Sequence, residues 1–329
     1  MTAKKHTPTI RDVADLAGVS LGTVSKVING KPVGESYVKK VNEAIKKLDY
    51  HVNSYAQGLK ASRTYTVAVL IPNTTDPFYG LLVHHLNHSL TRRGYRMLLC
   101  CTDFDMDLEQ EYVDMARQNK VDGIIGLTYN PNLQIDDDLP FVSIDRPIGK
   151  HPCVASDNFA GGQLAAQMLA ESGCKKVAFL RTGSDLNNEP NKRKSGFENG
   201  CELHGLSFDM KILRDGDPDE LFKDFLIKHI HGRKIDFDGL FCVTDTLAFI
   251  ILQFLKELGF DAPADIQVIG FDGVQNPGKT GYVCSTIRQP VEDISEMCVD
   301  LLLQDSSTIK PPLVCLPVTF ISAGTTKAI

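Results

Sequence analysis

The segment Gly273–Thr280 has the spacing of a phosphate-binding loop, with two glycines followed by Lys279 and a threonine. Such a loop holds phosphates through backbone amides and through the N-terminus of a helix that begins at its lysine. The residues that follow here, Gly281–Ile287, are rich in β-branched side chains, and Pro290 comes soon after them. We therefore interpret the match as a loop. A cytosolic P-loop-type nucleotide- or sugar-processing enzyme with a basic N-terminal appendage remains the alternative hypothesis.

Other catalytic patterns are weak or missing in the sequence. His84 and His88 have the i, i+4 spacing of one helix face, but neither an H-E-x-x-H motif nor a third ligand accompanies them. The one G-x-S-x-G match, Gly18–Gly22, falls between two predicted helices and lacks the preceding strand of a nucleophile elbow, and there is no G-x-G-x-x-G turn. We expect no catalytic residue, no metal and no cofactor, and hence a protein that is not an enzyme.

The N-terminal residues have the pattern of a DNA reader. Apolar periodicity and capping residues predict helices over 10–17, 21–28 and 36–48, with a tight turn at Gly18-Val19 between the first two. In a helix-turn-helix the start of the second helix meets base edges, and its neighbours hold phosphates. We predict base contacts by Leu21, Gly22 and Lys26, and backbone contacts by Thr9, Ser20, Thr23, Ser25, Asn29 and Tyr50. On pattern alone, an ordinary helical hairpin is the alternative.

The charge distribution favours the same reading. The chain has 329 residues and a formal net charge of −6, yet residues 1–65 carry 11 Lys+Arg against 5 Asp+Glu. A small basic segment on a large acidic body is typical of polyanion binding. Nine cysteines without a C-x-x-C pair suit a reducing compartment. No apolar run is long enough to cross a membrane, and no secretory signal is recognisable, so we expect a cytoplasmic protein.

After residue 66, apolar runs alternate with amphipathic stretches. Strands are predicted over 67–71, 97–101, 123–127, 141–144, 177–180, 240–243 and 268–271. Helices are predicted over about 78–93, 108–119, 159–172, 192–204, 219–230, 245–258 and 291–304. This alternation indicates doubly wound parallel sheets, and its length favours two lobes with a cleft between them. Such sheets bind ligands at the carboxyl ends of their strands.

The run from Thr9 to Gly30 (TIRDVADLAGVSLGTVSKVING) resembles the headpiece of the lactose-repressor (LacI/GalR) family of bacterial transcription regulators. The resemblance continues through 53–59 (NSYAQGL), which is similar to the hinge helix of that family. Core motifs follow in family order: 76–79 (DPFY), 121–125 (VDGII), 145–146 (DR), 156–158 (SDN), 193–197 (RKSGF) and 268–272 (VIGFD). The similarity thus spans essentially the whole chain.

The resemblance implies three parts. These are an all-α helix-turn-helix headpiece over 1–52, a hinge helix and linker over 53–65, and a two-lobed core over 66–329 like that of periplasmic binding proteins. Lobe 1 would comprise about 66–157 and 291–319, and lobe 2 about 158–290 and 320–329. Leu59 matches the leucine that, in the family, wedges between bases in the minor groove and kinks the duplex.

The core would bind a small effector. Arg193 offers a planar fork of donors, Asp272 at a strand end can accept from neighbouring hydroxyls, and aromatic rings can stack on a sugar face. The resemblance assigns effector contacts to Phe78, Tyr79, Arg146, Asp157, Arg193, Asp245 and Asp272.

Four positions depart from the family pattern. Lys26 stands where arginine is common, and lysine lacks the fork that reads guanine in two bonds. Val52 replaces a common proline, and Gly58 lowers helix propensity by about 1 kcal/mol relative to alanine. Thr244 replaces an asparagine, which leaves the effector open. We hypothesise that the hinge folds only on DNA, in which case Gly58→Ala would tighten operator binding in a gel-shift titration.

The sequence therefore predicts a homodimeric, effector-responsive transcription regulator, most simply a repressor, acting at a near-palindromic operator. A carbohydrate is favoured as effector over a purine, and a protein corepressor is the alternative partner. No membrane partner is expected.

Overall fold

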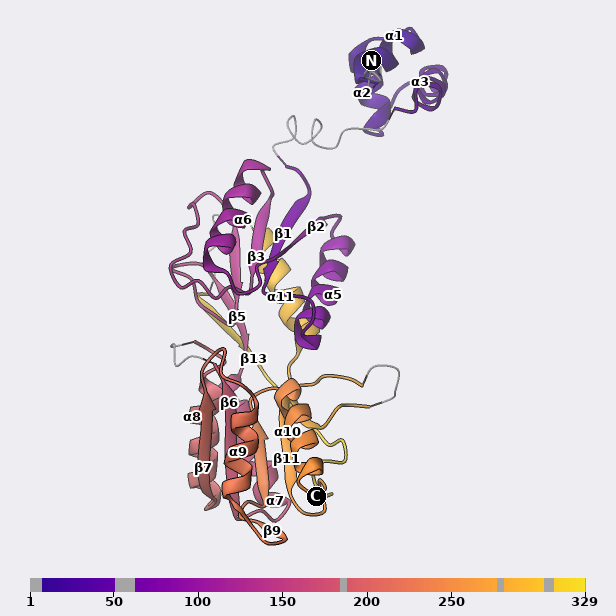
Figure 1. Ribbon diagram of the computed structural model, residues 1–329. Coiled ribbons are helices and arrows are strands. Elements are labelled where there is room, and N and C mark those ends of the chain that lie inside the picture. Colours follow the sequence, from indigo (N-terminus) through magenta and orange to yellow (C-terminus); the bar gives the residue numbers. More distant parts are fainter. Residues whose placement is uncertain (1–7, 51–62, 184–187, 277–280, 305–310, 329) are drawn as a thin grey trace, which may run out of the picture. The chain divides into compact units, whose positions relative to one another are not determined.

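The computed structural model describes residues 8–50, 63–183, 188–276, 281–304 and 311–328. The chain divides into two compact units, Met1–Thr64 and Tyr65–Ile329. Figure 1 labels the elements of both units, which are described separately below.

The first unit is a three-helix headpiece, as predicted. Its helices are α1 (Ile10–Ala17), α2 (Leu21–Ile28) and α3 (Glu35–Leu48). Thr9 and Asp12 form a capping box at the start of α1, in which the Thr9 backbone amide donates to Asp12 Oδ2 at 2.7 Å. The turn to α2 passes through Gly18 at φ 63°, a left-handed conformation that favours glycine. Ser20 then caps α2 by accepting from the Thr23 amide at 3.1 Å.

The headpiece has a small core of its own. The buried residues are Val13, Ala14, Ala17, Val24, Val41 and Ala44. They come from all three helices, and Tyr50 packs against them from the end of α3. Because these side chains are short, the three helices approach closely, and the remaining helix faces stay exposed.

The first lobe of the second unit contains a six-stranded parallel sheet. Its order is β13 (Leu313–Leu316), β5 (Cys153–Ser156), β4 (Phe141–Ile144), β3 (Gly123–Gly126), β1 (Thr66–Ile71) and β2 (Arg96–Cys101). Helices α5 (Pro77–Arg92) and α11 (Val291–Leu303) pack together on one face, and α6 (Met106–Gln118) covers the other. Strand β1 shows why: Val67, Val69 and Ile71 point to the α5–α11 face, whereas Ala68 and Leu70 point to α6.

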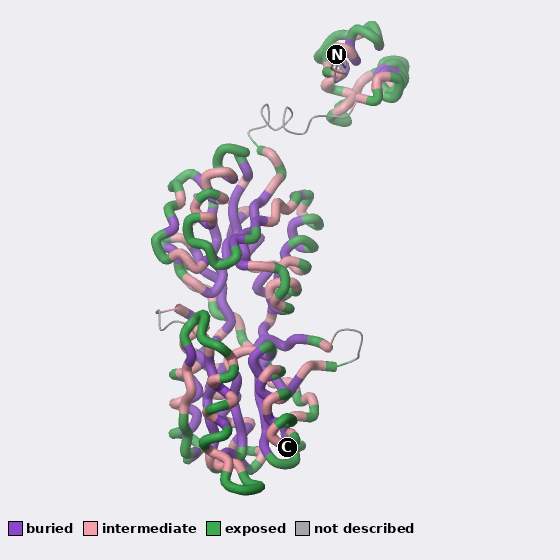
Figure 2. Tube along the Cα trace, viewed as in Figure 1, coloured by how far each residue is buried: buried purple, intermediate pink, exposed green. Residues whose placement is uncertain are grey.

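The second lobe repeats this architecture. Its sheet runs β14 (Thr319–Ile321), β12 (Ser285–Arg288), β11 (Gln267–Asp272), β10 (Gly239–Cys242), β6 (Lys176–Thr182) and β7 (Ser207–Leu213), with β14 antiparallel to β12. The helices are α7 (Asn158–Glu171), α8 (Lys192–His204), α9 (Glu220–Lys228) and α10 (Asp245–Glu257). Helices α7 and α8 cover one face, and α9 and α10 cover the other. A short hairpin of β8 (Ile230–His231) and β9 (Lys234–Ile235) follows α9. Figure 2 shows most strands buried between these helical layers.

The chain passes between the lobes three times. It leaves lobe 1 between β5 and α7, returns between β12 and α11, and crosses again between β13 and β14. Each lobe is therefore assembled from separate stretches of sequence. The predicted doubly wound, two-lobed fold is confirmed.

Several strands escaped sequence analysis. Strands β5, β13 and β14 have only three or four residues, and β7 is an edge strand that carries exposed polar residues, which obscures its apolar pattern. Strand β12 overlaps the β-branched run Gly281–Ile287, which follows the phosphate-loop match in the sequence. Gln275 bridges to Tyr282 in antiparallel fashion just before it. Residues 277–280 lie outside the described residues, and no helix begins within 281–288.

Candidate functional site

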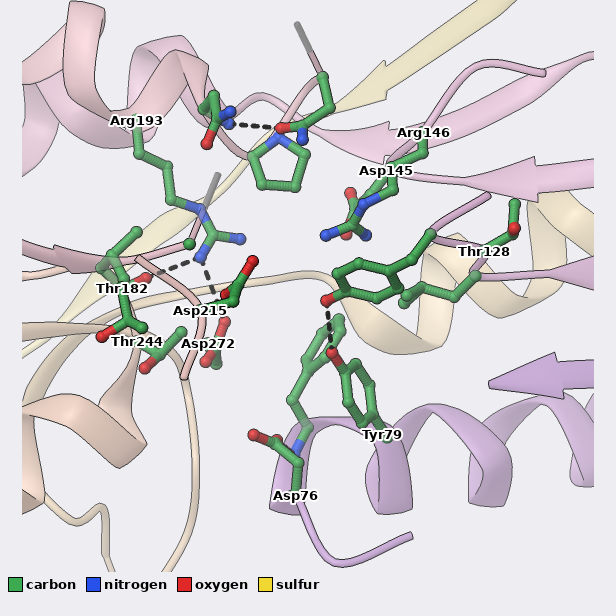
Figure 3. A pocket seen from close by; sticks show the side chains of 18 of the residues that line it. Asp76, Tyr79, Thr128, Asp145, Arg146, Thr182, Arg193, Asp215, Thr244 and Asp272 are labelled. Atoms are coloured by element: carbon green, nitrogen blue, oxygen red, sulfur yellow. Dashed lines mark hydrogen bonds and ion pairs between the residues drawn. The ribbon is translucent and has the colours of Figure 1, made fainter. Parts of the chain in front are cut away.

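A cavity of about 280 Å³ lies where the two sheets of the second unit present the carboxyl ends of their strands. Lobe 1 contributes the start of α5 and the loops after β3 and β4. Lobe 2 contributes the ends of β6 and β11, the loops after β7, β10 and β12, and the start of α8. Figure 3 shows side chains from both lobes pointing into this space. The cavity contains five of the predicted effector residues: Phe78, Tyr79, Arg146, Arg193 and Asp272.

Arg193 is the most constrained of these side chains. It is 4% exposed and lies over the ring of Phe271, with Cζ 3.6 Å from the ring centroid. Nε donates to Asn158 Oδ1 at 2.7 Å, and Nη1 donates to the Val243 carbonyl at 2.7 Å. Nη2 has no partner among the described residues and points into the cavity (Figure 3). Arg193 therefore presents one oriented cationic donor to a ligand.

The arginine belongs to a closed circuit of buried polar groups, here called the polar ring: Ser156, Asn158, Arg193, Asp272 and Gln289. Ser156 Oγ donates to Gln289 Oε1 at 2.7 Å, and Gln289 Nε2 donates to Asp272 Oδ1 at 2.8 Å. Asp272 Oδ1 lies 3.7 Å from Arg193 Nη1, and Asn158 Nδ2 donates to the Ser156 carbonyl at 2.9 Å. The polar ring includes residues of two of the three lobe crossovers, the one between β5 and α7 and the one between β12 and α11. Arg193 and Asp272, which face the cavity, are therefore hydrogen-bonded directly to the connections between the lobes.

Burial controls the electrostatics of the polar ring. It raises the pKa of Asp272 well above its usual value, although the neighbouring Arg193 lowers it. Burial lowers the pKa of Arg193, and Asp272 and Asp145 act in the opposite direction. Asp272 also has φ 124°, a strained conformation for a non-glycine residue. The structure thus holds an aspartate at a fixed place on the cavity wall.

The lobe 1 side of the cavity is an aromatic wall. The hydroxyls of Tyr79 and Tyr129 lie 2.9 Å apart, and Arg146 Cζ lies 3.8 Å from the centre of the Tyr129 ring. Phe104 packs edge-on against the same tyrosine, with 4.9 Å between the two ring centroids. Burial raises the pKa of Tyr79, so its hydroxyl stays protonated and available for hydrogen bonding. Arg146 is held flat by this stacking, with its edge toward the cavity.

Asp145 is a cavity residue that sequence analysis did not assign. It follows β4 at φ 62° and is 3% exposed. Its Oδ1 atom is buried without a hydrogen-bond partner among the described residues, and burial raises its pKa. A buried acceptor of this kind requires a donor, which a ligand hydroxyl in the cavity would supply. The sequence could have indicated this role, because Asp145 directly follows a predicted strand and ligands bind at the carboxyl ends of such strands.

Two predicted effector residues do not line the cavity. Asp157 caps α7, and its Oδ1 accepts from the Ala160 amide at 2.9 Å. Asp245 is 1% exposed, and its Oδ2 accepts from the amides of Gly273 and Val274 at 2.9 and 2.7 Å. Asp245 therefore holds the segment after Asp272 in place. Both carboxylates are used for structure, and we do not assign them effector contacts.

The cavity contains further residues that the sequence did not single out. Thr128, Tyr129 and Asn130 follow β3, Arg181 and Thr182 end β6, and Gln289 follows β12. Most of them lie in or beside loops, where periodicity carries no information. What they share is a position at the carboxyl end of a strand, and this position could have identified them as cavity residues.

The headpiece presents its predicted DNA-reading residues on its surface. Leu21, Gly22 and Lys26 are exposed on α2, and Leu21 is 44% exposed although it is apolar. An exposed leucine at a helix start is suited to contact with a thymine methyl group. The predicted backbone contacts are engaged locally: Ser20 and Thr23 share a hydroxyl contact of 2.9 Å, and Asn29 Nδ2 donates to the Ser25 carbonyl at 2.7 Å.

The other predicted headpiece and hinge residues differ in what the structure describes. The Thr9 hydroxyl donates to Asp12 Oδ2 within the capping box, and Tyr50 is half-buried against the headpiece core. Leu59, like Val52 and Gly58, lies outside the described residues.

Comparison with known proteins decides the family. Residues 64–299 match the family model described as periplasmic binding proteins and sugar binding domain of the LacI family. Residues 9–53 match the model for bacterial regulatory proteins of the lacI family. The chain belongs to the LacI family. The predicted membership is confirmed, and so is the predicted fold class, a helix-turn-helix domain followed by a two-lobed core of the periplasmic-binding type.

Curated relatives of this LacI-family chain include operon repressors. The sucrose operon repressor of Streptococcus mutans is 34% identical over 305 residues, covering 90% of this chain and 92% of the relative. The ribose operon repressor of Bacillus subtilis is 30% identical over 326 residues, covering 97% and 98%. The predicted class of transcription regulator is confirmed, and the P-loop enzyme alternative has no support.

Solved structures show the same fold. The Lac repressor dimer bound to operator and the anti-inducer ONPF superposes with a TM-score of 0.80 at 21% identity, over 98% of this chain and 100% of that one. A periplasmic binding protein/LacI transcriptional regulator from Alkaliphilus metalliredigens, complexed with D-xylulofuranose, gives 0.68 at 24% identity over 80% and 100%.

Within the described ranges, no helix has the length and apolarity needed to cross a bilayer. His84 and His88 both lie on α5, and the described part of the chain contains no group of three side chains able to hold a metal ion.

Proposed function

We propose that this LacI-family protein is a homodimeric repressor whose affinity for a near-palindromic operator is switched by a sugar or sugar derivative bound in the cavity between the lobes. Its place of action is the cytoplasm, where the operator is. The effector contacts are made by Phe78, Tyr79, Arg146, Arg193 and Asp272, with Asp145 added from the structure.

The observation that carries the effector proposal is the pairing of two different cavity walls. Lobe 2 offers the free Nη2 of Arg193 beside Asp272, whereas lobe 1 offers aromatic rings and the unpaired oxygen of Asp145. A sugar has hydroxyls that both donate and accept, together with an apolar ring face. It therefore satisfies both walls at once, and small-molecule sites are commonly built in this way. The relatives named for sucrose and ribose are consistent with this class.

The DNA-binding proposal concerns the exposed face of α2. Leu21, Gly22 and Lys26 would meet base edges, and Thr9, Ser20, Thr23, Ser25, Asn29 and Tyr50 would contact the phosphate backbone. Leu59 would be the minor-groove wedge. One headpiece buries little surface and reads few bases, so useful specificity requires two headpieces on a two-fold operator. The basic balance of residues 1–65 supplies the electrostatic part of the affinity.

The switch follows from linkage between the two sites. A ligand changes operator affinity only to the extent that it binds the DNA-competent and DNA-incompetent states with different affinities, typically by about 1–3 kcal/mol. The polar ring provides a route, because it connects cavity groups to the lobe crossovers. Whether the effector releases or recruits DNA is decided by which state it prefers.

The test uses the purified full-length chain. Operator sequences would be selected from random duplex DNA at fixed salt and confirmed by gel shift. Sucrose, D-ribose and cellobiose would then be screened by thermal shift and added to the operator complex. We expect at least one sugar to raise the melting temperature and to change operator affinity by about 5–150-fold. Equal, weak binding to all duplexes would refute DNA reading, and sugar binding without any effect on operator affinity would refute the switch.

A further inference from the structure

Glu109 is a buried carboxylate that lies outside the effector cavity. It is the fourth residue of α6, it is 0% exposed, and it does not line the cavity. No lysine, arginine or histidine in the described ranges forms an ion pair with it. A buried charge is unfavourable unless other groups satisfy it, so the partners of Glu109 indicate what it is for.

All three partners belong to one stretch of the cavity wall. Glu109 accepts a hydrogen bond from the Thr128 hydroxyl, one from the Tyr129 amide at 2.8 Å and one from the Asn130 amide at 3.0 Å. These three consecutive residues follow β3, and every one of them lines the cavity. A second contact joins the same loop to α6, since Asn130 Nδ2 donates to the Met106 carbonyl at 3.1 Å.

The tethered loop in turn positions two predicted effector residues. Tyr129 carries the Arg146 guanidinium on its ring face at 3.8 Å, and its hydroxyl meets that of Tyr79 at 2.9 Å. A shift of the loop would therefore move the aromatic platform, the guanidinium and the tyrosine hydroxyl together. Positioning groups that touch no ligand commonly fix the groups that do.

We propose that Glu109 is a positioning residue of the effector site. It fixes the 128–130 loop so that Tyr129 holds Arg146 and Tyr79 in the geometry that binds the sugar. This inference rests on the proposed function and deepens it.

The chemistry of the contact requires a carboxylate. Three donors converge on two acceptor oxygens, and both oxygens are used. In Glu109→Gln one oxygen becomes an NH2 group that faces a backbone N–H, so at least one hydrogen bond is replaced by two opposed donors. The side chain keeps its size, and the loop must move to relieve the conflict.

The decisive experiment compares Glu109→Gln with Val113→Ala. Val113, one turn further along α6, is also buried, but it belongs to a core cluster that does not include residues 128–130, so its truncation lowers stability without removing a hydrogen bond of the tether. We expect both variants to lower the melting temperature. Only Glu109→Gln should weaken the effector, by at least tenfold in calorimetric titration with whichever of sucrose, D-ribose and cellobiose binds the wild type. Val113→Ala should leave operator affinity without sugar unchanged.

A second readout needs no ligand. Arg146 Cζ lies 3.8 Å from the centre of the Tyr129 ring, so we expect the NMR resonances of the Arg146 side-chain protons to be shifted upfield in the wild type. Arg146→Lys identifies these resonances by removing them. Glu109→Gln should return these resonances toward ordinary arginine values, while Val113→Ala should not. If Glu109→Gln does not fold, Glu109→Asp is the substitute. It keeps the charge but moves the carboxylate away from the 128–130 loop, because its side chain is one methylene shorter. It should therefore shift the Arg146 resonances in the same direction.

The outcomes separate the two proposals. Wild-type affinity together with unmoved Arg146 resonances in a folded Glu109→Gln protein would overturn the role of Glu109. Absence of sugar binding by the wild type would count against the proposed function, while the Arg146 resonances would still decide whether Glu109 positions the loop.

Discussion

Arg193 combines a structural and a binding role in one side chain. Two of its nitrogens are used by Asn158 and by the Val243 carbonyl, and a third faces the cavity. Its charge also offsets that of the buried Asp272 at 3.7 Å. Lysine could not reproduce this arrangement, because only a planar fork donates in several fixed directions.

Removal of the guanidinium tests both roles. We expect Arg193→Met to abolish the sugar-induced melting shift and to lower the free energy of unfolding by about 3 kcal/mol, since Asp272 loses its counter-charge. Lys194→Met, on the partly exposed side of the same helix, should change neither quantity appreciably. The measurements are urea unfolding and thermal shift with and without sugar. A retained sugar response in the arginine variant would exclude Arg193 from the site.

Asp245 gives a prediction on pH. Burial raises its pKa to about 6, above the ordinary value of 3.8, although amide hydrogen bonds lower it in part. The folded state therefore binds the proton more tightly than the unfolded state does. The contribution of this group to stability is complete below about pH 4 and falls as the pH rises toward 6, by up to about 3 kcal/mol.

The comparison with Asp245→Asn isolates this contribution. The unfolding free energy of the wild type should fall relative to that of Asp245→Asn as the pH rises from 4 to 7. Asp224→Asn, an exposed change of the same kind on α9, serves as the matched control. Urea titrations at each pH measure both, and a flat profile for Asp245→Asn would contradict a raised pKa.

At the scale of elements, the closest helix packing lies directly beside the site. A Cβ atom on Gly196 of α8 would lie 2.0 Å from the Phe159 carbonyl oxygen of α7, and one on Gly162 would lie 2.2 Å from the Arg193 carbonyl oxygen. Backbone atoms cannot yield as flexible side chains can. The two glycines therefore set the distance between α7 and α8. They thereby also set the position from which the Arg193 side chain of α8 reaches into the cavity.

Gly196→Ala should force these helices apart. We expect the free energy of unfolding to fall by about 1–3 kcal/mol and sugar affinity to fall with it, because Arg193 is three residues away on the same helix. Ser195→Ala, an exposed neighbour, serves as the matched control and should leave both quantities near wild type. Unfolding and calorimetric titration provide the numbers, and an unaffected glycine variant would show that the helix contact is soft.

The elements themselves were largely predictable from sequence. Helices with clear periodicity and capping residues, such as α1 with Thr9 and Asp12, were placed within about two residues at each end. The four-residue strand β4 was predicted from its apolar run, but β5, β13 and β14 were missed, because three or four residues are too few to show an alternation. In the site, motif matches identified Arg193 and Asp272, whereas Asp145 and the loop after β3 required the fold. Asp157 and Asp245 matched by sequence, but their carboxylates accept local amides, which no linear pattern reveals.

At the scale of the whole molecule, the two units have separate cores. The headpiece core consists of six small buried residues, whereas the larger unit holds four extensive clusters. Small domains bury proportionately less surface and are less stable. We expect two calorimetric transitions, the headpiece melting first. A sugar at 100 times its dissociation constant should stabilise only the second, by about 2.7 kcal/mol. A single transition that moves as a whole on ligand addition would contradict this independence.

The threefold passage of the chain between the lobes also orders events during synthesis. The headpiece is complete once Thr64 has left the ribosome, but lobe 1 awaits β13 and lobe 2 awaits β14, which ends at Ile321. At translation rates of about 5–20 residues per second, this interval is about 13–50 s. A nascent or prematurely terminated chain thus carries a finished DNA-reading module before any ligand control exists. A chain that stops before β14 would hold a folded headpiece with an incomplete lobe 2, and we expect it to answer to no effector.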